Sequence, residues 1–171
     1  MKEKIYESKG KVREVFRKDM RPERENPYEA VEKYPDGTLC PECGVSFAKG
    51  RWTWAKPGPA EKVSSMLCPA CRQIQDDYAG GVLVLSGKFL AAHRDDLLHR
   101  VRNVEKAERK EHPLQRIMGI VDKGAEIEIR ATSEHLIARM GKALKSDFEG
   151  ELELSYGLEE HFARAHWRRD T

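Results

Sequence analysis

Apolar and polar positions follow regular patterns from Gly80 to the end of the chain. The apolar run at 82–85 predicts a short buried strand, and Ser86 after it is a candidate N-cap for a helix. We expect that helix over about 88–110, because its apolar residues recur at three- and four-residue steps and Pro113 follows its end. The apolar stripe consists of Phe89 or Leu90, Leu97, Val101 and Val104.

A hairpin and a second helix follow the first helix. The segments 116–121 and 126–131 flank a turn at 122–124, and alternation in the second segment predicts two paired strands. Thr132 or Ser133 can cap the next helix, which has the clearest helical periodicity in the chain. Its repeating apolar residues are Leu136, Ile137, Met140, Ala143, Leu144 and Phe148.

These elements predict a fold for the second half of the chain. Alternation at 151–156 indicates a further strand, and the segment 162–169 can add a last one. The order is then strand, helix, strand, strand, helix, strand, which is that of a ferredoxin-like (βαββαβ) α+β domain over residues 80–171. Both helices would pack on one face of an antiparallel sheet. The other face is either a free docking surface or is covered by the N-terminal segments.

Residues 1–38 are interpreted as a charged arm. They contain ten Lys or Arg and nine Asp or Glu, with prolines at 22, 27 and 35. The arm is either a mobile tail or an extended, partly helical segment that orders against the rest of the chain or a partner. A roughly helical spacing is present at Ile5, Val12, Val15, Phe16 and Met20.

All four cysteines lie in a short module at 39–79 and form two C-x-x-C pairs. The first pair is Cys40 and Cys43, and the second is Cys68 and Cys71. Zn²⁺ prefers four tetrahedral ligands, and two such pairs supply four thiolates with no open position. The spacing therefore predicts one structural zinc ion in a zinc-ribbon or treble-clef-like module, since the module has too few apolar residues to form a core. A redox-active dithiol is the alternative chemistry.

The charge balance limits how this chain could bind nucleic acid. The sequence has 31 Lys or Arg against 29 Asp or Glu, for a formal net charge of +2. Binding by the overall field needs a strong basic excess, so binding to RNA here requires a local patch. Two clusters of arginine and tryptophan are candidate contacts, namely Arg51, Trp52 and Trp54, and Trp167, Arg168 and Arg169. The alternative for the first cluster is a small aromatic core packed on the zinc site.

Further cations lie on the first long helix. They run from Lys88 to Lys110, and Arg116 follows just beyond the helix. Acidic residues such as Glu105 and Glu108 alternate with them, so a solvent-exposed face with ordinary ion pairs is the simpler interpretation.

Other kinds of chemistry find little support. The glycine-rich segment 80–89 lacks the phosphate-loop pattern, because residue 82 is Val and residue 89 is Phe. The six histidines are scattered, and no nucleophile motif accompanies them. No stretch approaches the roughly 18 apolar residues of a membrane span, and the N-terminus lacks a signal-peptide pattern. We therefore expect a cytoplasmic, non-catalytic protein without a membrane role.

The motifs CPECG at 40–44, GRWTW at 50–54 and CPACR at 68–72 resemble those of an uncharacterised bacterial zinc-knuckle family. Together with GGVLVLSGKFL and EIEIRATSEHLIARMGKAL, they also resemble the N-terminal part of the archaeal and eukaryotic export adaptor family for the large ribosomal subunit. This resemblance covers roughly residues 38–169. It implies that the four cysteines are zinc ligands and that the protein associates with the ribosome or structured RNA. The adaptor family typically has twice as many such cysteines.

These features predict a zinc protein that docks on structured RNA, such as rRNA, or on a ribosomal particle. The arginine and tryptophan clusters would make the contacts. A protein–protein adaptor that uses the zinc module and the arm, without nucleic acid, is the alternative function.

Overall fold

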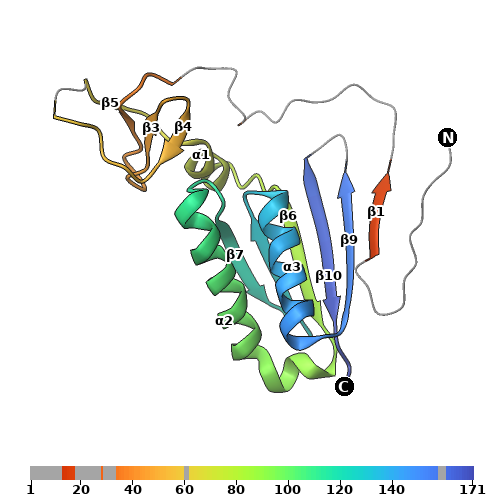
Figure 1. Cartoon of the computed structure of the whole chain (residues 1–171). Helices are drawn as coiled ribbons and strands as arrows, with labels where there is room; N and C mark the ends of the chain where they lie inside the picture. The colour runs from red at the N-terminus through yellow and green to blue at the C-terminus, as the bar shows by residue number, and fades with distance from the viewer. Residues whose placement is uncertain (1–12, 18–27, 29–33, 60–61, 158–160) are drawn as a thin grey trace.

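The computed structural model describes residues 13–17, 28, 34–59, 62–157 and 161–171. These residues form an α+β fold with two sheets and three helices (Figure 1). The larger sheet carries the two long helices, and the smaller sheet lies at one end of it with the short helix. Two separate clusters of buried side chains accompany the two sheets.

The large sheet contains all five strands that the sequence predicts after Gly80. Its order is β1-β9-β10-β6-β8-β7. The strands are β1 (Arg13–Arg17), β6 (Gly81–Ser86), β7 (Ile117–Asp122), β8 (Glu126–Ala131), β9 (Glu151–Gly157) and β10 (Phe162–Arg168). The predicted hairpin is confirmed, because β7 and β8 pair antiparallel.

Strand β10 changes the order of the sheet from the one that we predicted. A ferredoxin-like sheet would place β9 directly beside β6, but β10 lies between them, antiparallel to β9 and parallel to β6. Ala163, Ala165 and Trp167 alternate along β10 and are each at most 3% exposed. These side chains fill the core under the helices, and hydrogen bonds to a strand on each side hold β10 in the middle of the sheet. The predicted ferredoxin-like strand order is therefore wrong, although the order of elements from β6 to β9 is as expected.

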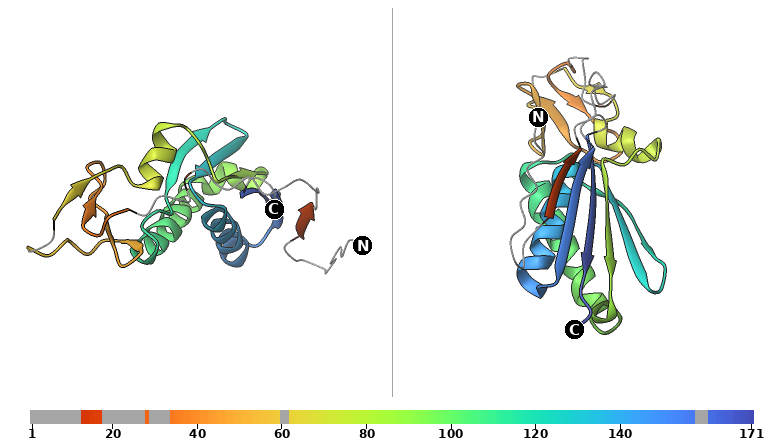
Figure 2. Two further views of the ribbon diagram at one scale, coloured as in Figure 1. Left: turned by 90° about the horizontal axis from the view of Figure 1, so that it is seen from above. Right: turned by 90° about the vertical axis from the view of Figure 1, so that its right-hand side faces the viewer.

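Both long helices pack on one face of the large sheet (Figure 2). They are α2 (Lys88–Glu111) and α3 (Glu134–Phe148), and both were predicted. Ser133 caps α3 by accepting a hydrogen bond from the amide of His135 at 3.1 Å. Gly87 precedes α2 with a φ of 99°, and a Cβ there would lie 2.2 Å from the carbonyl oxygen of Arg169. Only glycine therefore fits at this strand-to-helix turn.

The small sheet and the helix after it hold the cysteines. Its order is β4-β3-β2-β5. The elements are β2 (Thr38–Leu39), β3 (Ser46–Ala48), β4 (Arg51–Thr53), β5 (Ser64–Ser65) and α1 (Pro69–Gln75). Tyr34 and Thr38 are also buried here, so the unit begins before the boundary predicted at residue 39. We call the described residues between 34 and 79 the cysteine unit.

The predicted arm is described in part. Arg13–Arg17 form β1, which pairs parallel with β9 at the edge of the large sheet. The helical spacing of Val15 and Phe16 was therefore misleading, because backbone pairing with a sheet edge outweighs so short a pattern. The other positions of that pattern, Ile5, Val12 and Met20, lie outside the described residues.

The second face of the large sheet carries no helix in the described part of the chain. Val82, Val84, Arg164 and His166 line a hollow on this face. The cysteine unit lies mainly beyond one end of the sheet (Figure 2), and its Asp77 reaches this face by pairing with Arg130 of β8. The alternative that the cysteine unit and the arm cover this face stays a prediction, because most of the arm lies outside the described residues.

Candidate metal centre

The first pair of cysteines lies in the tight turn between β2 and β3. The amide of Gly44 donates to the carbonyl of Cys40 at 2.9 Å, and the amide of Cys40 donates to the carbonyl of Val45 at 2.9 Å. Gly44 has a φ of 78°, a conformation that glycine adopts without strain. The turn thereby brings the side chains of Cys40 and Cys43 to the same side.

The second pair lies at the start of α1. Cys68 is the N-cap residue, Pro69 occupies the first helical position, and the Cys68 sulfur accepts a hydrogen bond from the amide of Cys71 at 3.4 Å. Proline is well suited to this position, because its missing N–H has no partner there and its φ is already helical. The first turn of the helix therefore presents two sulfurs to the turn between β2 and β3.

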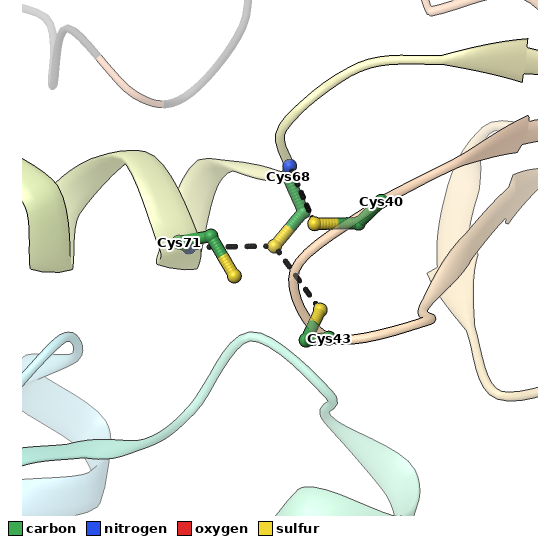
Figure 3. A group of neighbouring side chains, drawn as sticks. All are labelled: Cys40, Cys43, Cys68 and Cys71. Atoms are coloured by element: carbon green, nitrogen blue, oxygen red, sulfur yellow. Dashed lines mark hydrogen bonds between the residues drawn. The ribbon is translucent and has the colours of Figure 1, made fainter.

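The four sulfurs gather around one point. They all lie within 4.8 Å of one another, and those of Cys43 and Cys68 are 3.7 Å apart (Figure 3). A zinc ion bonded to four thiolates at about 2.3 Å separates neighbouring sulfurs by about 3.8 Å, so the cluster has the dimensions of a tetrahedral site. Cys40, Cys68 and Cys71 are at most 7% exposed. The arrangement can hold a metal ion without an open coordination position.

Burial and hydrogen bonding act in opposite directions on these thiols. Burial raises the pKa of the Cys40 thiol. Hydrogen bonds from the amides of Cys68, Cys43 and Glu42 lower this pKa by more than burial raises it, so that the pKa is about 7. Burial raises the pKa of Cys68 and of Cys71. The ionised form of this second pair therefore requires a compensating positive charge, which a bound metal ion supplies.

Arg116 lies directly beside the sulfurs and is 5% exposed. Its guanidinium donates to the sulfur of Cys43 at 3.0 Å and to the sulfur of Cys71 at 3.2 Å. Its Nε donates to the carbonyl of Pro113 at 2.9 Å. Burial lowers the pKa of the guanidinium, but the hydrogen bonds to Cys43 and Cys71 raise that pKa above its ordinary value. Arg116 is therefore charged, and it offsets part of the negative charge of the thiolates.

The charge arithmetic explains why an arginine is tolerated at this depth. Four thiolates with one bound Zn²⁺ would carry a net charge of −2, and the guanidinium would reduce it to −1. A buried arginine without such a partner would cost several kcal/mol, about as much as breaking a buried ion pair. From its position in the sequence, Arg116 was expected to be a surface cation, and its burial corrects that expectation. Arg116 directly precedes β7, and no local pattern in the sequence indicates its burial.

The cysteine unit is joined to the large sheet around this centre. Gln73 donates to the carbonyl of Thr132 at 3.0 Å, and the hydroxyl of Thr132 donates to the carbonyl of Leu114 at 2.7 Å. Arg130 on β8 pairs with Asp77 after α1 at 2.7 Å. Together with Arg116, these contacts place the metal centre at the junction of the two units.

The first arginine and tryptophan cluster is divided by the fold. Trp52 packs edge-on against Tyr34, with ring centroids 4.9 Å apart, and it also packs against the cysteine cluster. It is thus part of a small aromatic core, which was the alternative interpretation. Arg51 is exposed on β4, and Trp54 is 38% exposed. Trp54 donates its indole N–H to the carbonyl of Arg109 at 2.7 Å and so reaches the end of α2.

The second cluster does not assemble as a surface patch. Trp167 is fully buried and donates to the carbonyl of Glu149 at 2.8 Å, so its prediction as a contact residue is wrong. The alternation of β10 points it into the core, opposite to its neighbour Arg168, which is exposed and pairs with Asp170 at 2.9 Å. Arg169 lies over the ring of Phe89, 4.1 Å from its centroid.

The resemblance to the zinc-knuckle family and to the export adaptor family stays a prediction. No family model, curated protein or solved structure matches this chain significantly. In the described part of the chain, every helix is too short or too polar to span a bilayer.

Proposed function

We propose that this chain is a cytoplasmic, non-catalytic zinc protein that docks on structured RNA or on a ribosomal particle. Zinc would be held by Cys40, Cys43, Cys68 and Cys71 in a treble-clef-like unit, since one pair comes from a turn between strands and the other from a helix start. The metal would fix the small sheet and its contacts with α2, because few apolar side chains are available there for a core.

One observation carries the RNA part of this proposal. Trp54 is exposed at the junction of the two units, where the guanidinium of Arg109 lies 5.4 Å from the centroid of its ring. Lys106 and Lys110 line the same surface hollow. An aromatic ring among cations is the combination that stacks on unpaired bases and holds phosphates. The chain thus has a local patch despite its low net charge.

The test is affinity purification of the full chain from cells, with and without nuclease. We expect rRNA or ribosomal particles to co-purify, to be lost after nuclease treatment, and to dissociate as the salt concentration rises. Co-purification of a defined set of proteins that resists both nuclease and salt would contradict the RNA proposal.

That contrary result would favour the second candidate, a protein–protein adaptor. The cysteine unit exposes Val63, which is 56% exposed, and Met66, which is 37% exposed, in addition to Trp54. Exposed apolar side chains of this kind anchor protein interfaces, and their contribution changes little with ionic strength.

A further inference from the structure

Helix α2 has one face that no other described segment covers. Its buried residues are Leu90, Leu97, Val101 and Val104, which share one side of the helix at its period of 3.6 residues per turn. Arg102, Lys106 and Lys110 are exposed and fall on the opposite side. They follow one another at intervals of four residues, so each is about 6 Å further along the axis than the last.

Two acidic residues close to this outer row have partners on the flanks of the helix, and Glu105 keeps its negative charge because its partner is a neutral amide. Glu105 accepts a hydrogen bond from the amide of Ile117 at 2.8 Å, and Glu108 pairs with Arg139 of α3 at 3.1 Å. Arg100 on the flank pairs with Asp147 of α3 at 2.5 Å. The flanks of the helix are thus paired with its neighbours. Within the described residues, Arg102, Lys106 and Lys110 form no ion pair.

Trp54 lies at the C-terminal end of the same row. Lys106, Arg109 and Lys110 line the hollow beside it, with Glu105, whose carboxylate is already bonded to a backbone amide. On the N-terminal side, the row of cations is limited by Asp95, which lies about two turns before Arg102 on the same side of the helix. The result is a short positive track with an aromatic ring at one end.

We propose that this track binds a single-stranded segment of RNA, an inference that rests on the proposed function above. Successive phosphates would lie along Arg102, Lys106 and Lys110, and one base would stack on the exposed part of Trp54. A continuous duplex fits less well, because its bases are stacked on one another and cannot reach the ring. Acidic peptides have no planar base to offer to the indole.

The experiment measures fluorescence anisotropy of a labelled oligouridine of about 12 nucleotides, within the range that such surfaces cover. The zinc-loaded full chain is titrated at several salt concentrations. The key variant is Lys106→Gln/Lys110→Gln. The matched control is Lys88→Gln/Lys123→Gln. It removes the same charge from the start of α2 and from the turn between β7 and β8, where Lys123 pairs with Glu128.

The key variant should bind at least about 10-fold more weakly than the unmodified chain. The slope of the logarithm of its binding constant against the logarithm of the salt concentration should fall in magnitude by about 1.4, since each lost phosphate contact on a single strand removes about 0.7. The control should bind like the unmodified chain. Trp54→Ala should weaken binding about 5- to 100-fold, and Trp54→Phe should restore most of it. Zinc content and circular dichroism confirm that each variant is folded.

The outcomes separate the site from the function. Equal binding by the key variant and its control would overturn this site while leaving the RNA function in place. Tighter binding of a matched duplex than of oligouridine would overturn the single-strand assignment. Absence of binding to oligouridine, duplex and purified ribosomal particles would overturn the proposed function itself, and the site with it.

Discussion

Replacing Cys68 by serine abolishes stoichiometric zinc binding and unfolds the cysteine unit. Cys68 is fully buried and lies 3.7 Å from the sulfur of Cys43, so its loss removes one of the four candidate ligands. Serine can still cap α1, so the expected effect comes from the lost sulfur and not from the lost cap. Structural zinc contributes about 10–16 kcal/mol to the folding of zinc-finger peptides, far more than one buried side chain supplies. Metal analysis and thermal unfolding of the full chain measure this loss.

The large sheet should survive that substitution. Its core is a separate cluster that includes Leu83, Ile129 and Met140, and none of these side chains depends on the metal. Met66→Ser is the matched control, since Met66 is exposed in the same unit and is not a ligand. If the Cys68→Ser chain kept one zinc per molecule with unchanged unfolding, the four-cysteine site would be excluded.

Replacing Arg116 by methionine accelerates zinc loss and lowers stability. The substitution keeps an apolar stem but removes the cation that donates to Cys43 and Cys71 at 3.0 and 3.2 Å. Loss of a hydrogen-bonded partner of metal ligands typically weakens metal affinity about 10- to 100-fold. Leaving buried thiolates without their cation costs about 3–5 kcal/mol. Arg116→Lys should retain part of the effect, because lysine keeps the charge but not the planar fork.

Transfer of zinc to a coloured chelator measures the first effect, and chemical denaturation measures the second. Arg130→Met is the control, because it breaks the partly exposed pair with Asp77 at the same junction. Exposed pairs of this kind contribute about 0–1 kcal/mol. If the Arg116→Met chain released zinc as slowly as this control and were equally stable, Arg116 would have no special role at the centre.

Local patterns were sufficient for the two long helices, for the five strands after Gly80 and for the gathering of the four cysteines, but not for β1 to β5. A stripe such as Leu97, Val101 and Val104 fixes one side of a helix, and two C-x-x-C turns need only short-range geometry to present their sulfurs. The position of β10 could not be predicted in this way. Alternation along Ala163, Ala165 and Trp167 indicates a strand but does not say which neighbours it pairs with.

The wrong predictions for Trp167 and Arg116 also arise because local sequence patterns carry no information on tertiary contacts. Trp167 and Arg168 are adjacent in sequence, yet the pleat of β10 sends one into the core and the other to solvent. Arg116 is 45 residues beyond Cys71 in the chain, and only the docking of the cysteine unit on the large sheet brings them together. Residues joined by tertiary contacts of this kind have no signature in local spacing.

Zinc content of the purified full chain tests the central claim most directly. Native mass spectrometry before and after chelation, combined with alkylation of thiols, should find one zinc ion per chain and four cysteines that react only after the metal is removed. A metal-free chain with freely reactive thiols, or one whose cysteines cycle between thiol and disulfide, would contradict the account.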